Sequence, residues 1–425
     1  MIAWLLISFF VLLFLGVPIA MSLGLSAMGG ILFLGGGSTV TIAQRMFEGM
    51  NSFALLAIPL YTFAGFTMSK GGISKRLMDF CYSIVGHIYG GLAHVNVLSS
   101  MIFAGISGSA VADTAGVSGM FMPEMVRKGY SKNFTVAVTA ISSTIGIIIP
   151  PSIPMVVIAG ICGISTGKLF LGGIIPGVLC GLAQMIVSYF LAKKEGVPKE
   201  HGHFTIGPVL HGLWESWPAL LMPIIIVGTI TMGIVSPTEA GVIAVVYGLF
   251  AGGIIYRELK WEDIKFAFAE TVRTSGRIFI VIGAAKLYTV MLTTAGFDKW
   301  VAKTMLGFST NPTVILIMIL LIFFIVTMFM ESIATLTLFM PILYPIALGV
   351  GINPIVLSVL ITVVIGVGLV TPPVGMCIYV ACDLMDVTVG EVFPTLVPFI
   401  AATFVCIALM VAFPQLILLP TYLMA

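Results

Sequence analysis

The chain has 425 residues, of which 59% are hydrophobic and 8% are charged, and its formal net charge is +2. Its mean hydropathy is +1.18, and apolar stretches long enough to cross a bilayer recur from end to end, so the composition excludes a soluble domain. The apolar runs are continuous rather than alternating, which excludes a β-barrel and predicts an all-α polytopic membrane protein.

The first half of the chain is predicted to contain spans at 2–17 and 18–36, broken at Pro18, and a third at about 52–69. The first stretch lacks a basic start and continues past Pro18 into apolar sequence, so we expect a span rather than a signal peptide. A short polar segment with Arg45 and Glu48 precedes this third span, and residues 73–88 carry charge on one side, as a helix in the membrane interface does.

The next segments are interrupted rather than continuous. Residues 91–127 are apolar on both flanks of the small, polar stretch from Gly105 to Asp113, which predicts either two spans or a re-entrant hairpin with this stretch at its tip. The segment at about 133–165 is broken by Pro150-Pro151, and a span follows at about 168–192.

The second half repeats this pattern. Spans are predicted at about 217–235 and 237–256, a charged interfacial segment at 257–275, a span at 276–295 and an amphipathic piece from Phe297 to Leu306. A second hairpin-like unit at 312–349 is followed by a segment at 354–386 that Pro372-Pro373 breaks, and by a last apolar run from 390.

Matching residues indicate a duplication. Asp113 aligns with Glu331 at an offset of 218, and Gly72 aligns with Gly296 at an offset of 224. At an offset of 222 the first-half residues Gly129, Gly146 and Pro150-Pro151 align with Gly351, Gly368 and Pro372-Pro373. We therefore predict two repeats, 1–200 and 201–425.

The second repeat is expected to be inverted, because each half crosses the membrane five times when a hairpin returns to its own side. Placing 127–132 in the cytoplasm also places 70–76, 193–199 and 257–277 there, and these segments hold fourteen of the Lys and Arg residues. The opposite side holds four, and the loop 349–354 carries no charge, as the positive-inside rule requires of an inverted copy.

The two tips and the two Pro-Pro breaks are the candidate site. Backbone without helical pairing survives at membrane depth only where it lines an enclosed, wet site, and two such breaks in matching positions point to a transporter's binding site. Hydroxyls and freed carbonyls make a hard oxygen site that suits Na⁺ and not a transition metal. One site is predicted to use Ser107, Ser109, Gly146, Ile149 and Pro150, and the other Ser332, Thr335, Gly368, Thr371 and Met376. The alternative is that these small residues only allow close helix packing.

Asp113 and Glu331 are carboxylates at membrane depth, which are costly and mark functional sites. Each could ligate a cation, carry a proton, or accept hydrogen bonds from tip amides. Together with Gly108, Pro151 and Pro373 they define the expected substrate end of the hairpins, where positive helix ends favour an anion.

Other function classes fit less well. The sequence has no G-x-S-x-G, H-E-x-x-H or C-x-x-C motif and no Walker A motif, so we expect neither an enzyme nor an ATPase, and no organic cofactor. The six cysteines lack metal-ligand spacing and are interpreted as core residues. A channel is disfavoured because duplicated hairpins with broken helices fit alternating access better than an open pore.

The motifs Gly105–Thr114, Pro150-Pro-Ser152, Ser236-Pro-Thr-Glu-Ala240 and Val370-Thr-Pro-Pro-Val-Gly375 resemble those of the large membrane subunit of tripartite ATP-independent periplasmic (TRAP) transporters. The resemblance covers essentially the whole chain. It implies a sodium-coupled secondary transporter of the ion-transporter superfamily, working as an elevator. In that scheme the hairpins and broken helices form a transport domain that slides against a scaffold of the remaining spans.

The resemblance also implies partners and a location. These are a separate small four-helix membrane subunit, a periplasmic substrate-binding protein and the bacterial inner membrane. The implied substrate is an organic acid, of the sialic acid or C4-dicarboxylate class, and the chain resembles members of sialic-acid systems most. The alternative is a sodium–carboxylate symporter that works without a binding protein.

Overall fold

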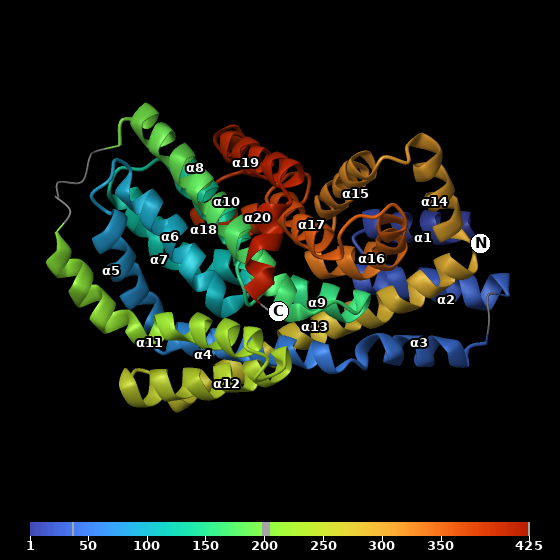
Figure 1. Ribbon diagram of the computed structural model, residues 1–425, viewed down its shortest axis with the longest axis horizontal. Helices are drawn as coiled ribbons and strands as arrows, with labels where there is room; N and C mark the ends of the chain where they lie inside the picture. The colour runs from blue at the N-terminus through green and yellow to red at the C-terminus, as the bar shows by residue number, and fades with distance from the viewer. Residues whose placement is uncertain (36–37, 198–204, 424–425) are drawn as a thin grey trace.

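The computed structural model describes residues 1–35, 38–197 and 205–423, and within these ranges all regular secondary structure is helical (Figure 1). Residues 198–204 lie outside this description, so the expected boundary between the repeats and Lys199 do too. Seven of the described helical segments are long and apolar enough to cross a membrane, and their outward side chains are largely apolar, as for Trp214 and Ile224.

The first half contains a run of single helices followed by a hairpin and a broken helix. The helices are α1 (Ile2–Phe14), α2 (Ile19–Leu34), α3 (Val40–Met50), η1 (Phe53–Leu56), α4 (Ala57–Lys70), α5 (Ile73–Val85), α6 (Gly91–Ser107), α7 (Ala110–Arg127), α8 (Lys132–Ser143), η2 (Thr144–Ile147), α9 (Ile153–Cys162) and α10 (Thr166–Glu195).

The second half also contains single helices followed by a hairpin, a broken helix and a long helix. Its helices are α11 (Ile206–Thr231), α12 (Pro237–Phe250), η3 (Ala251–Ile255), α13 (Trp261–Thr294), α14 (Phe297–Phe308), α15 (Pro312–Thr327), α16 (Ser332–Gly349), α17 (Pro354–Gly368), α18 (Met376–Met385), α19 (Val389–Ala412), α20 (Gln415–Leu418) and η4 (Leu419–Leu423).

One prediction from local composition was wrong, and one helix lies in a segment for which no secondary structure was predicted. The polar segment around Arg45 and Glu48 forms helix α3, which continues the line of η1 and α4 (Figure 1). The segment 257–275 and the span 276–295 form one helix of 34 residues, α13, which packs along α2, α3 and α4. Its charged first half continues into the apolar half through Gly276, because a single Gly inside a helical pattern is tolerated and the helix contains no Pro.

The first parts of the two broken helices, α8 and α17, form the buried centre of the molecule. All of α17 from Ile355 to Gly368 and all of α8 from Phe134 to Ser143 are buried. The two halves exchange partners: α18 packs against α7, and α9 packs against α16. The last long helices of the halves, α10 and α19, pack against each other.

Helix caps in the two halves are related by one offset. Ser109 and Glu331 are the N-caps of α7 and α16, and Ser131 and Asn353 are the N-caps of α8 and α17. Both pairs are 222 residues apart (331 − 109 and 353 − 131), as are the two Pro-Pro pairs. Glu331 therefore occupies the helical position of Ser109, and the offset of 218 that pairs it with Asp113 misaligns the tips by one helical turn.

Candidate functional site

The first hairpin turns on two residues between α6 and α7. Gly108 ends α6 with φ of 65°, a left-handed conformation that glycine adopts without strain. Ser109 then starts α7, and its side-chain oxygen accepts a hydrogen bond from the Ala112 amide at 3.4 Å. The tip is therefore a tight reversal with a capped helix start.

Asp113 lies in the first turn of α7, and its side chain is buried, with 1% exposure. The Ser107 hydroxyl donates a hydrogen bond to its Oδ1. Its Oδ2 is buried and has no hydrogen-bond partner among the described residues. Oδ2 faces η2, because a Cβ added to Gly146 would overlap it. An unpaired carboxylate oxygen thus lies between the tip and the broken helix.

The tip contacts the first Pro-Pro break directly. The amide of Ile153 donates a hydrogen bond to the Gly108 carbonyl at 3.2 Å, and a Cβ on Gly108 would lie 2.7 Å from the Pro151 carbonyl oxygen. The Ser152 hydroxyl donates to the Ile147 carbonyl and accepts from the Met155 amide. Ser152 thus caps the start of α9 beside the break, and the backbone that follows the two prolines contacts the hairpin tip.

The second tip is built differently. Glu331 is itself the N-cap of α16, and its Oε2 accepts hydrogen bonds from the amides of Ile333 at 3.0 Å and Ala334 at 3.4 Å. The Ser332 hydroxyl donates to Oε1 at 2.8 Å. Both carboxylate oxygens of Glu331 therefore have local partners. Of the three roles considered for it, this arrangement favours the acceptor of hydrogen bonds from tip amides.

The second break also meets its own tip. The Val374 amide donates to the Met328 carbonyl at 3.0 Å, and a Cβ on Gly368 would lie 2.7 Å from the Thr327 Cβ. Unlike Pro150 and Pro151, which are buried, Pro373 and Val374 are exposed. The two Pro-Pro bonds are both cis.

The predicted residues of the first site are brought together only in part. Asp113 contacts both Ser107 and Gly146, and Gly108 lies against Pro151. Ile149 extends its side chain toward Gly177 on α10, so only its backbone is left for the site.

In the second site, hydrogen bonds join Ser332 and Thr335 to Glu331. The Thr371 hydroxyl, three residues beyond the end of α17, donates to the carbonyl of Val367 in that helix. Met376 begins α18, and the next residue, Cys377, interacts with Thr114 and lies near both Asp113 and Glu331.

Sequence reasoning missed a buried polar layer between α6 and α8. Asn96 donates to the Thr139 hydroxyl at 2.7 Å and accepts from Ser142 at 2.9 Å, and Ser100 donates to Ser142 at 3.0 Å. The available signal was the recurrence of polar residues on one side of two helices that are otherwise apolar. The layer fixes the first hairpin to its broken helix.

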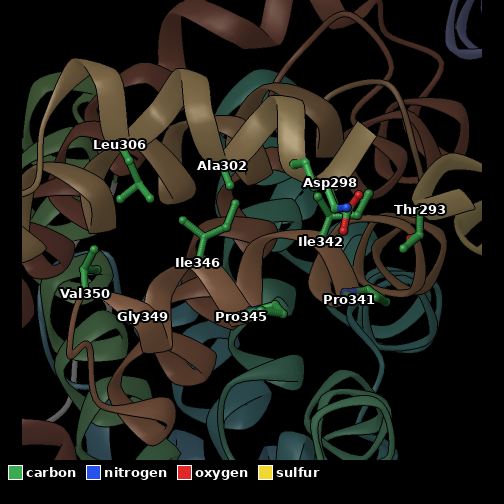
Figure 2. Close-up of a pocket in the computed structure, with 11 residues that line it drawn as sticks. Thr293, Asp298, Ala302, Leu306, Pro341, Ile342, Pro345, Ile346, Gly349 and Val350 are labelled. Carbon is green, nitrogen blue, oxygen red and sulfur yellow. The ribbon is translucent and has the colours of Figure 1, made fainter. Parts of the chain in front are cut away.

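A cavity of about 350 Å³ lies away from both tips, between α14 and the C-terminal half of α16 (Figure 2). Asp298 is at one end of it, and Leu306 and Val350 are at the other. Because Pro345 and Gly349 line it, the cavity lies at the base of the second hairpin and not at the predicted ion sites.

The chain has clear relatives. A family model described as "Tripartite ATP-independent periplasmic transporter, DctM component" matches residues 6–416. The sialic acid TRAP transporter large permease protein SiaM of Vibrio cholerae is 35% identical over 411 residues, which cover 96% of this chain and 95% of that protein. The isethionate TRAP transporter permease protein DctMQ of Oleidesulfovibrio alaskensis is 37% identical over 393 residues, which cover 92% of this chain but only 62% of that protein.

A solved structure shares the fold. The crystal structure of the YdaH transporter of Alcanivorax borkumensis superposes with a TM-score of 0.59 over 87% of this chain and 86% of that chain. The sequences are 13% identical, so this likeness concerns the arrangement of helices alone.

Proposed function

The chain belongs to the DctM family of tripartite ATP-independent periplasmic transporters, and from this premise we propose that it couples Na⁺ entry to the uptake of an organic acid. It is a multi-pass inner-membrane transport protein, and its relatives are permease subunits rather than enzymes. The single observation that carries the coupling proposal is the unpartnered, buried Oδ2 of Asp113.

The first cation site is proposed around that oxygen. A buried carboxylate oxygen without a hydrogen bond or a counter-ion is costly, and the cost is removed when a cation binds beside it. Asp113 together with the oxygens of Ser107, Ser109 and the carbonyls from Gly146 to Pro150 provides hard oxygen ligands. Such ligands select an alkali or alkaline-earth ion over a soft metal.

The second cation site is proposed around three hydroxyl groups that already donate their hydrogens to other protein atoms. Ser332 donates to Glu331, Thr335 donates to the Glu331 carbonyl at 3.1 Å, and Thr371 donates to Val367 at 2.7 Å. A hydroxyl that donates its hydrogen keeps its lone pairs, which are then free to face a cation. Gly368 and Met376 would add backbone oxygens.

The substrate is proposed to bind between the tips. The start of α7 is a positive helix end that favours a carboxylate, with Gly108 and Pro151 on one side and the exposed Pro373 on the other. The first amides of α16 already bond to Glu331. The acid is of the sialic acid or C4-dicarboxylate class. The sulfonate-bearing isethionate is named for one relative, so the shared substrate chemistry is an organic anion.

The proposed motion is that of an elevator built from two inverted repeats. Thr144 of the first repeat meets Gly366 of the second, and these residues are 222 apart (366 − 144), so each touches its own counterpart. Self-contact of this kind occurs on a two-fold axis, and the exchanged pairs α7–α18 and α16–α9 obey the same axis. The hairpins and broken helices would move together, against a scaffold to which α13 belongs.

Two partners are proposed from the family: a small four-helix membrane subunit and a periplasmic substrate-binding protein. The test is uptake into proteoliposomes that hold this chain and its small subunit, with and without an inward Na⁺ gradient and the binding protein. Uptake that requires both supports the tripartite symporter. Uptake that requires Na⁺ alone would favour a symporter that works without a binding protein, and uptake that requires neither contradicts the coupling.

A further inference from the structure

We propose that the cavity between α14 and α16 is a specific site for one membrane phospholipid with a primary ammonium headgroup, of the phosphatidylethanolamine kind. The proposal does not depend on the transported solute. It rests on the cavity, on the chemistry of its two ends and on the position of α14 relative to the bilayer.

Helix α14 has the properties of a helix that lies in the membrane interface. It is 12 residues long and amphipathic, with Lys299 and Lys303 exposed. Trp300 is 59% exposed and stacks on Phe297 at 5.6 Å between ring centroids. Tryptophan and lysine together are typical of the headgroup level of a bilayer, so the cavity below α14 opens where lipid headgroups are found.

One end of the cavity is polar and incompletely satisfied. Asp298 lines it, and its Oδ1 is buried without a hydrogen-bond partner among the described residues (Figure 2). Lys299, the next residue in the chain, also lines the cavity, and neither Lys299 nor Lys303 belongs to any ion pair found in the described part of the chain. An ammonium donor would satisfy Asp298, and a phosphate would pair with Lys299.

The rest of the cavity is apolar. Ala302 and Leu306 of α14 face Ile346 and Val350 across it (Figure 2), which suits the first methylenes of an acyl chain. The Asp298 carboxylate would bind the ammonium of the lipid, the Lys299 ammonium would bind its phosphate, and the apolar wall would contact its hydrocarbon chain. Phosphatidylglycerol lacks the ammonium, and phosphatidylcholine lacks the N–H donors.

The first half of the chain provides a comparison. The helix that corresponds to α14 is α5, which packs against α6 and is covered by α11, with Gly212 in close contact with Phe80. Helix α5 is therefore covered by protein on two sides. Around α14 the cavity beside α16 is left open.

The test uses the full-length chain in nanodiscs that contain equal amounts of phosphatidylethanolamine, phosphatidylglycerol and phosphatidylcholine, followed by native mass spectrometry of retained lipid. We expect retention of phosphatidylethanolamine over the other two by about tenfold, the effect of one charge-assisted hydrogen bond. Asp298→Asn should abolish that preference, while Glu262→Gln, which alters an exposed carboxylate at the start of α13, should keep it.

A second variant tests the proposal independently, in case Asp298→Asn does not fold. Ala302→Phe fills the apolar end of the cavity and leaves Asp298 in place, so it should lower the retention of all three lipids. Equal retention of the three lipids by the unaltered chain, or an unchanged preference in Asp298→Asn, would overturn the proposal.

Discussion

Asp113 and Glu331 are both carboxylates at hairpin tips, but their oxygens have different partners. Both oxygens of Glu331 accept hydrogen bonds from its own helix start, whereas one oxygen of Asp113 has none. The one-turn difference in position accounts for this, because an N-cap residue reaches the free amides and a residue in the next turn does not. We therefore propose that Asp113 contributes to cation binding and that Glu331 acts as a helix cap.

Replacing Asp113 tests the first assignment. Asp113→Asn keeps the size of the side chain and removes the charge beside the proposed ion, so the apparent Na⁺ affinity should fall by about tenfold or more, the loss of one charge-assisted contact. The measurement is the Na⁺ concentration that half-maximally activates uptake, with Asp79→Asn, an exposed carboxylate on α5, as the control. An unchanged Na⁺ dependence would remove Asp113 from the site.

Glu331 should instead show its effect in stability. Glu331→Ala removes a helix cap and should lower the free energy of unfolding by about 1 kcal/mol. Glu331→Ser should lose less, because serine is a good N-cap and is the residue found at the corresponding position 109. Thermal unfolding of the two variants in detergent decides the matter, and equal losses would contradict a capping role.

At the scale of elements, the breaks in the helices could be predicted from the sequence, but the helices that continue through polar sequence could not. Glycine, proline and small polar residues inside apolar runs predicted both hairpins and both broken helices, because those residues act locally on the backbone. The long helix α13 was divided in error, since hydropathy follows the environment of a segment rather than its helical hydrogen bonds. Helix α3 was missed for the same reason.

The polar layer between α6 and α8 is another element-scale feature, and it is absent from the corresponding interface of the second half. Asn96, Thr139 and Ser142 correspond at the offset of 222 to Met318, Ile361 and Val364. The α15–α17 interface is therefore apolar at the three positions where the α6–α8 interface is hydrogen-bonded.

This difference predicts a non-additive set of variants. Asn96→Met alone removes the hydrogen bonds that Asn96 makes with Thr139 and Ser142 and should lower the free energy of unfolding by about 1 kcal/mol. The triple variant Asn96→Met, Thr139→Ile, Ser142→Val reproduces the apolar interface of the other half and should be no less stable than the single one. Thermal unfolding measures both; a triple variant that loses the sum of three separate costs would show that the layer is not a unit.

At the scale of the whole molecule, the sequence predicted the duplication but not how its halves meet. Offsets between matching residues cannot reveal that α7 packs on α18 and α9 on α16, because such contacts depend on tertiary packing. Nor could they reveal that the breaks differ in exposure, with Val374 41% exposed and Pro151 buried. The substrate path is therefore expected to open beside the second break.

Inversion of the second half is tested by labelling matched positions from the two sides of the membrane. Arg127 and Gly349 are the last residues of α7 and α16, are exposed, and are 222 residues apart (349 − 127). A Cβ on Gly349 meets nothing within 4 Å, so cysteine is tolerated there. The background carries Cys162→Ser, because Cys162 is the native cysteine that is not buried.

In intact cells with a permeable outer membrane, a membrane-impermeant maleimide should label Gly349→Cys and leave Arg127→Cys unlabelled. In inside-out vesicles the pattern should reverse, because the basic segment 127–132 is expected in the cytoplasm. Labelling of both cysteines from one side would mean that the halves are parallel, and the two-fold contact of Thr144 with Gly366 could not then lie on an axis in the membrane plane.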